Sequence, residues 1–337
     1  MKAIIQVLFI VISLYASSAK TSEIQETNNA EISQADVQKS IEETLNVLDD
    51  VYIYPEKTKA IHDEIIKRMN NGDYKFIKTK QEFVDKISDD LIEVSKDRHL
   101  SVMLVKPDEV EPTHVLTETK DERKYNFAFQ KVEVLSGNIG YVKFNKFYQD
   151  EEALITVDHA FGFLANTDAM IIDLRDNIGG SPELVRYILS HFFKEKTLLW
   201  RSHSRANKDI YDNESIEGIG AQNFKTNYPL FVLISAHTAS AAEVFSYTLK
   251  HLGKAMIIGE TTVGMAHGVS AVKINDYFSG RFSMSRPSNP ITHTSWEGVG
   301  VIPNIPTTAE KSLNISHIKA LNALGIKSKS VSQDDTD

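Results

Sequence analysis

The chain has 337 residues, no cysteine and a formal net charge of −9 at pH 7. The absence of cysteine excludes disulfides and thiolate metal sites, and a chain of this length can bury a sizeable apolar core without them. The acidic excess argues against nucleic acid and anionic membrane surfaces as partners, because both favour basic faces.

The first 19 residues predict a secretory signal peptide. Lys2 supplies a positive charge, residues 4–14 form an apolar run, and residues 16–19 (ASSA) offer small side chains before a cleavage site between Ala19 and Lys20. A membrane anchor is the alternative, but a spanning helix needs about 20 apolar residues and this run is shorter. We therefore expect an exported protein, periplasmic or extracellular, with no membrane span after cleavage.

Residues 20–31 are polar and predict a flexible leader. Residues 32–95 predict a small helical domain. Its three helical patterns begin near Ser33, after Pro55 and after Thr79, where Thr79 and Glu82 have the spacing of a capping box.

Residues 96–326 predict a second, larger domain of the α/β class. After a strand at 99–104 comes a hairpin that turns at 136–138, and then helical patterns alternate with short apolar strands. The helices are expected at about 151–165, after Pro182 and from about Ser240, and the strands at 169–174, 230–235 and 255–258. This alternation predicts crossover βαβ units on a largely parallel sheet. Residues 327–337 are polar and predict a disordered tail.

Two strand-to-helix turns are candidates for a site, because sites in open α/β sheets form where strands end. In the first turn, Gly179 and Gly180 follow a buried strand and precede Pro182. Paired glycines let a backbone amide approach a ligand closely, and such amides can stabilise an oxyanion. An ordinary strand-to-helix turn explains the two glycines equally well.

The second turn places Ser240 at the start of a helix, where its hydroxyl could be a nucleophile supported by the amide of Ala241. The competing interpretation is structural, because Ser240 and Glu243 also have the spacing of a capping box. A serine nucleophile needs a base, and the histidines at positions 99, 237 and 267 are all candidates. Their spacing does not choose among them.

Five segments in order give the chain a resemblance to the tail-specific (C-terminal-processing) serine peptidase superfamily. They are similar to the branch that contains the tricorn protease core and the repeats of interphotoreceptor retinoid-binding protein. The resemblance implies a ClpP/crotonase-like catalytic domain that acts on peptides or unfolded proteins without a cofactor or metal. The segments are VSKDRHLSV, MIIDLRDNIGGSPE, HTASAAEVF, IIGETTVG and WEGVGVIPNI.

Carried over to this chain, the resemblance implies Ser240 as the nucleophile, His99 as its base and Glu297 as a carboxylate that helps to hold the base. The implied oxyanion hole is the amide of Ala241 with that of Gly179 or Gly180, of which Gly179 is favoured. The oligomeric state is not implied.

Two departures from the family pattern bear on the mechanism. Met265 stands where the better-known branch has the lysine of a Ser-Lys dyad, and a thioether cannot accept a proton. Arg98 stands where the tricorn core has a serine that relays to the glutamate, so it could pair with Glu297 or face outward. There is also no room between His99 and the hairpin for a PDZ module.

The function predicted from the sequence is therefore an exported serine peptidase, either an endopeptidase or a tail-processing enzyme. The main alternative is a non-catalytic binding protein for retinoid-like or fatty-acid-like ligands on the same fold. An esterase that uses the same residues is a third possibility.

Overall fold

The computed structural model describes residues 30–105, 122–205, 209–219 and 228–326. The chain divides into two compact units. Unit 1 contains the described residues up to 105 together with Val269–Ser283, and unit 2 contains the rest from residue 122 to Gly268 and from Met284 onward. The predicted signal peptide, residues 20–29 of the leader and the C-terminal tail lie outside the described residues.

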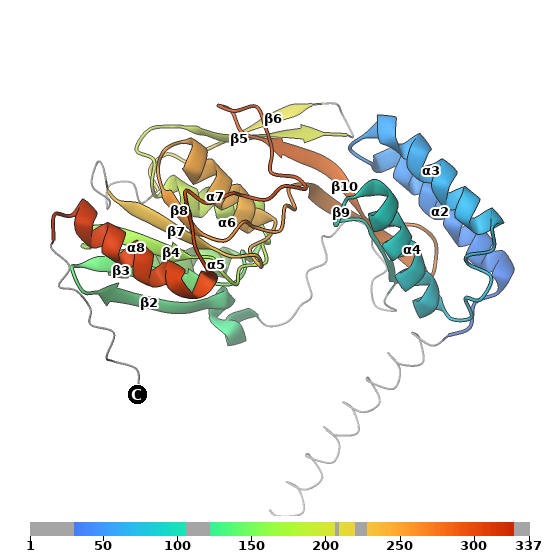
Figure 1. Cartoon of the computed structure of the whole chain (residues 1–337), viewed down its shortest axis with the longest axis horizontal. Coiled ribbons are helices and arrows are strands. Elements are labelled where there is room, and N and C mark those ends of the chain that lie inside the picture. The colour runs from blue at the N-terminus through green and yellow to red at the C-terminus, as the bar shows by residue number, and fades with distance from the viewer. Residues whose placement is uncertain (1–29, 106–121, 206–208, 220–227, 327–337) are drawn as a thin grey trace, which may run out of the picture. The chain divides into compact units, whose positions relative to one another are not determined.

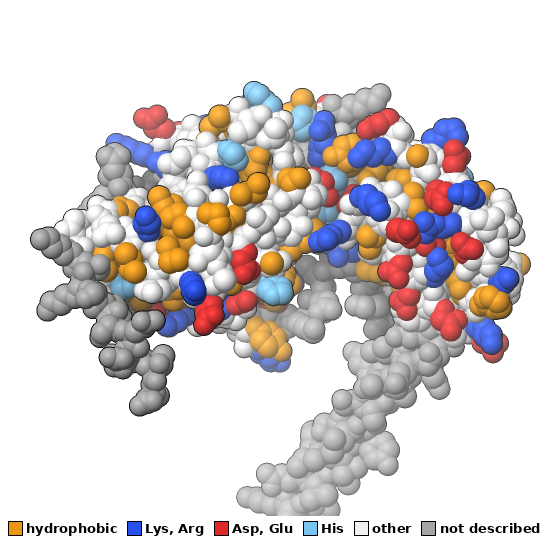
Figure 2. All heavy atoms as spheres, viewed as in Figure 1, with side chains coloured by type: hydrophobic (Ala, Val, Ile, Leu, Met, Phe, Trp, Pro, Cys, Tyr) orange, Lys and Arg blue, Asp and Glu red, His pale blue; other side chains and the backbone are white. Residues whose placement is uncertain are grey.

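Unit 1 contains the three predicted helices, α2 (Gln34–Val51), α3 (Pro55–Asn70) and α4 (Lys80–Ser95) (Figure 1). The capping box of α4 has formed: the Glu82 amide donates to Thr79 Oγ1 at 3.2 Å and Glu82 Oε2 accepts from the Thr79 amide at 3.2 Å. At the end of the predicted leader, Glu31 pairs with Thr79. Acidic and basic side chains are interspersed on the face of these helices seen in Figure 2.

The boundary predicted at residue 95 misses the strands of unit 1. Besides its helices, unit 1 contains three strand segments. They are β1 (Ser101–Leu104), β9 (Gly268–Lys273) from Val269 onward, and the first half of β10 (Phe278–Ser288). Strand β10 runs antiparallel to β1, with Ser101 opposite Arg281, and β9 pairs with β10. The ring of Phe278 packs against that of Phe83 in α4 with their centroids 4.8 Å apart. A segment far along the sequence therefore completes the core of the N-terminal unit.

Unit 2 is built on a six-stranded sheet in the order β11-β8-β7-β4-β3-β2. All neighbours are parallel except the hairpin β2–β3, so the predicted largely parallel α/β sheet is confirmed. Its strands are β2 (Phe129–Leu135), β3 (Ile139–Phe144), β4 (Ala169–Asp173), β7 (Leu230–Ile234), β8 (Met256–Gly259) and β11 (Ile305–Pro306).

Helices cover both faces of this sheet. Alternate residues of β3, β4 and β7, such as Val142, Ile172 and Val232, share a core with the three crossover helices. The residues between them, such as Tyr141 and Ile171, face the C-terminal helix through Ala320. The helices are α5 (Glu151–Leu164), α6 (Pro182–Ser190) and α7 (Ala241–His251) on one face and α8 (Ala309–Ala323) on the other.

The remaining elements of unit 2 are a short 3-10 segment, η1 (Glu122–Ala128), and the antiparallel pair β5 (Leu198–Ser204) and β6 (Ile210–Glu214). The second half of β10 pairs with β5, with Ser285 opposite Ser204. Within the described ranges, no helix combines the length and the apolar character that crossing a membrane requires.

Candidate active site

The two turns singled out from the sequence lie side by side in unit 2. Strands β4 and β7 are parallel neighbours, so the turns that follow their carboxyl ends emerge at the same edge of the sheet. Gly179 and Gly180 precede α6, and Ser240 is the residue before α7. The amide of Ala239 donates to the carbonyl oxygen of Asn177 at 3.0 Å, which ties one turn to the other.

The backbone of Ser240 has an unusual conformation. Its φ of 53° and ψ of −119° lie outside the regions that residues with a side chain ordinarily occupy. Such a conformation costs on the order of 1–3 kcal/mol and is concentrated at functional sites. The nucleophile elbow of α/β-hydrolases presents its serine on a comparably strained strand-to-helix turn. A plain helix cap requires no such strain, so the geometry favours the nucleophile over the structural interpretation.

Gly179 presses directly against this serine. A Cβ atom added at Gly179 would lie 2.7 Å from the Cβ of Ser240 and 2.9 Å from both the carbonyl oxygen of Ala239 and the amide nitrogen of Ala241. At Gly180, an added Cβ would lie 2.0 Å from the carbonyl oxygen of Phe147. Both glycines also have positive φ values, 95° and 133°. Close approach of backbone to backbone explains the paired glycines better than a simple turn does.

The amides of this turn point in different directions. The Gly179 amide, favoured from the sequence as an oxyanion donor, donates to Oδ1 of Asn177 at 2.9 Å. Phe147 bonds to the residues on either side of Gly180, accepting from the Ser181 amide and donating to the Gly179 carbonyl oxygen. The Gly180 amide therefore faces away from Phe147. Gly180 and Ala241, at the first position of α7, are the stronger donor candidates.

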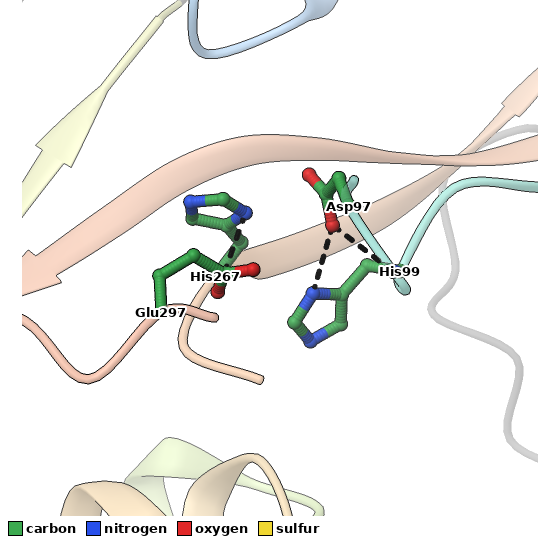
Figure 3. A group of neighbouring side chains, drawn as sticks. All are labelled: Asp97, His99, His267 and Glu297. Carbon is green, nitrogen blue, oxygen red and sulfur yellow. Dashed lines mark hydrogen bonds and ion pairs between the residues drawn. The ribbon is translucent and has the colours of Figure 1, made fainter. Parts of the chain in front are cut away.

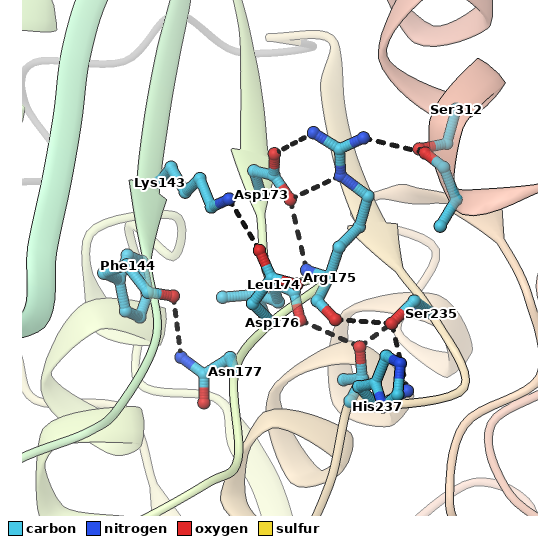
Figure 4. A network of polar contacts seen from close by, with 12 residues as sticks. Lys143, Phe144, Asp173, Leu174, Arg175, Asp176, Asn177, Ser235, His237 and Ser312 are labelled. Carbon is cyan, nitrogen blue, oxygen red and sulfur yellow. Dashed lines mark hydrogen bonds and ion pairs between the residues drawn. The ribbon is translucent and has the colours of Figure 1, made fainter.

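Asn177 is a residue that the sequence did not single out. It is fully buried, and its Nδ2 donates to the carbonyl oxygen of Phe144 at 3.0 Å (Figure 4). Together with the bonds to Gly179 and Ala239, this contact fixes the glycine turn against β3 and against the serine turn. Nothing in the sequence marks an asparagine in a polar turn for such a role.

A buried ion pair lies beneath the two turns (Figure 4). Asp173, at the end of β4, accepts from Nε of Arg175 at 2.9 Å and from the hydroxyl of Tyr141 at 2.6 Å. Ser235 donates to the carbonyl oxygen of Arg175, and Thr238 Oγ1 donates to that of Leu174 at 2.8 Å. Burial alone would raise the pKa of the Asp173 carboxyl, but the bonds from Arg175 and Tyr141 hold it below its ordinary value.

Replacing Asp173 with asparagine is expected to destabilise the protein by about 3 kcal/mol, because it leaves a half-buried guanidinium without its carboxylate. Since the folded-state pKa is lowered, this contribution is present above about pH 4 and is lost as the pH falls through the folded value. Thermal unfolding at pH 7 and pH 3 should therefore show a smaller acid-induced loss in Asp173→Asn than in the wild type. The control is Asp176→Asn, whose carboxylate pairs with Lys143 near the surface. Equal pH dependence of wild type and Asp173→Asn would contradict the assignment.

A shallow cavity of about 210 Å³ lies beside the glycine turn. Its walls come from the start of α5 and the start of α6, so it offers space for a side chain next to Ser181. The lining residues are Tyr148, Gln149, Asp150, Glu151, Leu154, Ser181, Glu183 and Leu184.

His99 belongs to unit 1, where a carboxylate orients it (Figure 3). Its Nδ1 lies 3.2 Å from Oδ1 of Asp97, and its backbone amide donates to the same oxygen at 3.0 Å. The hydroxyl of Tyr52 donates to Oδ2 of Asp97 at 3.2 Å. A histidine held through Nδ1 by a buried carboxylate is the arrangement of a general base in catalytic triads. The neighbouring Arg98 is exposed.

The resemblance implied that Glu297 helps to hold His99. Glu297 belongs to unit 2. Its Oε2 accepts from the Ala266 amide at 2.6 Å and lies 3.6 Å from Nδ1 of His267 (Figure 3). Each of the two histidines thus has a carboxylate within its own unit, and the one that holds His99 there is Asp97. Asp97 stands two residues before His99 in the segment VSKDRHLSV, and no role was assigned to this carboxylate from the sequence.

Comparison with known proteins agrees with this architecture. Residues 138–307 match the model of peptidase family S41, and residues 30–135 match the N-terminal domain of peptidase S41 in eukaryotic IRBP. Carboxyl-terminal-processing peptidase 2, chloroplastic, of Arabidopsis thaliana is 32% identical over 204 residues, which cover 58% of this chain and 38% of that protein. A carboxyl-terminal-processing protease of Picosynechococcus is 24% identical over 203 residues, which cover 60% of this chain and 47% of that protein. The matched regions therefore span less than half of the length of either relative.

Two solved structures share the fold over most of the chain. A putative peptidase from Parabacteroides merdae has a TM-score of 0.60 at 19% identity, and a lipoprotein from Streptococcus agalactiae has a TM-score of 0.55 at 14% identity. Each match covers 85% of this chain and 96% of the other. The family model covers half of this chain, including both turns of the site, and the chain therefore belongs to peptidase family S41.

Proposed function

We propose that this chain is a serine peptidase that cleaves peptides or unfolded proteins, with Ser240 as nucleophile and His99 as general base. The observation that carries the proposal is the strained backbone of Ser240, which packs against Gly179 at the start of α7. Family membership supports the reaction type, and the resemblance to tail-specific peptidases supports the substrate class.

The proposed reaction has two halves. Ser240 Oγ attacks the peptide carbonyl carbon while His99 takes its proton, and the oxyanion that forms is stabilised by the amides of Gly180 and Ala241. The C–N bond breaks as protonated His99 gives the proton to the amine that leaves. Water then attacks the acyl-enzyme with His99 again as base, and Ser240 regains its proton as the acid is released.

The test compares the purified protein with its Ser240→Ala variant on a library of peptides from denatured proteins, with new termini read by mass spectrometry. Termini made by the wild type alone would support the proposal and report the cleavage preference. If neither protein cleaves while both are folded, the peptidase proposal fails, and binding of a retinoid-like or fatty-acid-like ligand becomes the next measurement.

We further propose export, with cleavage after Ala19, on the evidence of the charged start, apolar run and small residues of the first 19 positions. When the full chain is expressed in a host with a secretory pathway, the recovered protein should begin at Lys20. N-terminal sequencing of the protein from the periplasm or medium measures this. A full-length chain that starts at Met1 and stays in the cytoplasm would contradict it.

A further inference from the structure

Glu243 lies one turn into α7 and is fully buried in unit 2. Its Oε2 accepts from the amides of Ser240 and Met265, both at 2.8 Å. Its Oε1 accepts from the Gly264 amide at 2.7 Å and from the hydroxyl of Thr262. A capping-box glutamate needs only the first of these four bonds, so three of them serve another purpose.

The other three donors belong to the turn that follows β8. This turn is also held by the Val263 amide, which donates to the carbonyl oxygen of Thr238 at 3.1 Å, and by the Val301 amide, which donates to Thr262 Oγ1 at 2.6 Å. One carboxylate therefore joins the serine turn to the turn at residues 262–265. Burial raises the pKa of Glu243, and the four hydrogen bonds that it accepts oppose that rise.

The bond to the Ser240 amide acts on the residue whose backbone is strained. Among the described contacts, the Ser240 N–H bonds to Glu243 Oε2. Without this acceptor, no described contact of the N–H would hold φ at 53°. A change in this dihedral would move the Ser240 hydroxyl relative to the amides of Gly180 and Ala241. A misplacement of about 1 Å at a reacting group can lower a rate by about 100-fold.

We propose that Glu243 is a positioning residue for the nucleophile, which it holds in the reactive conformation by bonding the Ser240 amide and the 262–265 turn together. The inference rests on the proposed peptidase function and deepens it. In the sequence, Glu243 has the signature of a helix cap. The proposal adds that Glu243 affects the rate of the chemical step.

The test uses Glu243→Gln, which keeps the shape of the side chain but replaces one acceptor oxygen with an NH₂ group. In either orientation of the amide, at least one backbone N–H then faces another donor, because four donors surround the side chain. We expect kcat for peptide cleavage, and the rate of Ser240 phosphonylation by a fluorophosphonate probe, to fall by about 100-fold. KM should stay within about twofold, because the change moves the nucleophile and leaves the substrate contacts in place.

The matched control is Glu82→Gln, the other capping-box glutamate, which lies at the start of α4 in unit 1. It should lower the melting temperature by a few degrees and leave both rates unchanged. Thr262→Val is the second variant, in case Glu243→Gln does not fold. It removes the hydroxyl that donates to Glu243 Oε1 and accepts from the Val301 amide, both away from Ser240, and we expect a rate loss of about 3- to 10-fold.

The outcomes separate the two proposals. If the wild type neither cleaves peptides nor reacts with the probe at Ser240, the peptidase proposal fails. If the wild type reacts and folded Glu243→Gln reacts equally fast, only the positioning role is overturned. The positioning role is also overturned if Glu243→Gln has a lower melting temperature but the wild-type kcat at temperatures well below it. Glu243 would then act only as a helix cap. Wild-type rates in Thr262→Val would overturn the role if Glu243→Gln cannot be purified.

Discussion

Replacing Ser240 with alanine is expected to lower kcat/KM for peptide cleavage by a factor of about 10⁴ or more, as loss of the nucleophile does in other serine peptidases. The change removes one oxygen and leaves in place the turn and the bond from the Ser240 amide to Glu243. The melting temperature should therefore hold or rise slightly, while reaction with a fluorophosphonate probe disappears. Both are measured on the same preparation.

Ser246→Ala is the control for this experiment. Ser246 lies in the same helix, is fully buried, and donates through Oγ to the carbonyl oxygen of Ala242 at 2.8 Å. Its loss should affect stability modestly and cleavage hardly at all. Equal cleavage by the wild type and Ser240→Ala would mean that another nucleophile or a contaminating protease is responsible.

Replacing His99 with glutamine is expected to have an effect of similar size, because without a base the Ser240 hydroxyl is a weak nucleophile. The side chain of glutamine fills similar space and can still bond to Asp97, but its amide cannot accept a proton. Cleavage and phosphonylation should both fall by about 10⁴-fold. Circular dichroism would show whether unit 1 has kept its fold.

His267→Gln is the matched variant for this comparison, since His267, like His99, is a buried histidine beside a carboxylate and was a candidate base. If His99 is the base, His267→Gln should retain most of the activity. If His267→Gln is inactive and His99→Gln is active, the base is His267, with Glu297 as its partner. The two variants thus decide which histidine–carboxylate pair serves the nucleophile.

The sequence predicted the helices of unit 1 and the parallel sheet of unit 2 because their apolar residues recur at clear periods. Helix α8 was missed because its fully buried positions are Ser312, Ser316 and Ala320, while the apolar residues that pack against the core, such as Leu313 and Leu321, are only partly buried. The two serine hydroxyls donate to carbonyl oxygens of the same helix, which lets small polar side chains be buried against the sheet. Hydrophobic periodicity is weak on a face where small polar residues stand among the apolar ones.

The candidate site was predictable only in part for a similar reason. Ser240 and the paired glycines follow apolar strands, and this placement is visible in the sequence. The roles of Asn177 and Glu243 are not, because Asn177 donates to the carbonyl oxygen of Phe144 and Glu243 accepts from the amide of Met265, each far away along the chain. A side chain that bonds to remote backbone groups leaves no local pattern in the sequence.

The two halves of strand β10 pair with different strands. Residues 278–281 pair with β1, and residues 285–288 pair with β5. A deletion that removes the N-terminal unit at one cut would leave Phe278 and Phe282, both fully buried, without the core that covers them. The converse fragment, ending at residue 105, would lack the strand that runs beside β1. Neither unit is therefore one continuous segment of the chain, and a single cut in the chain cannot separate the two units intact.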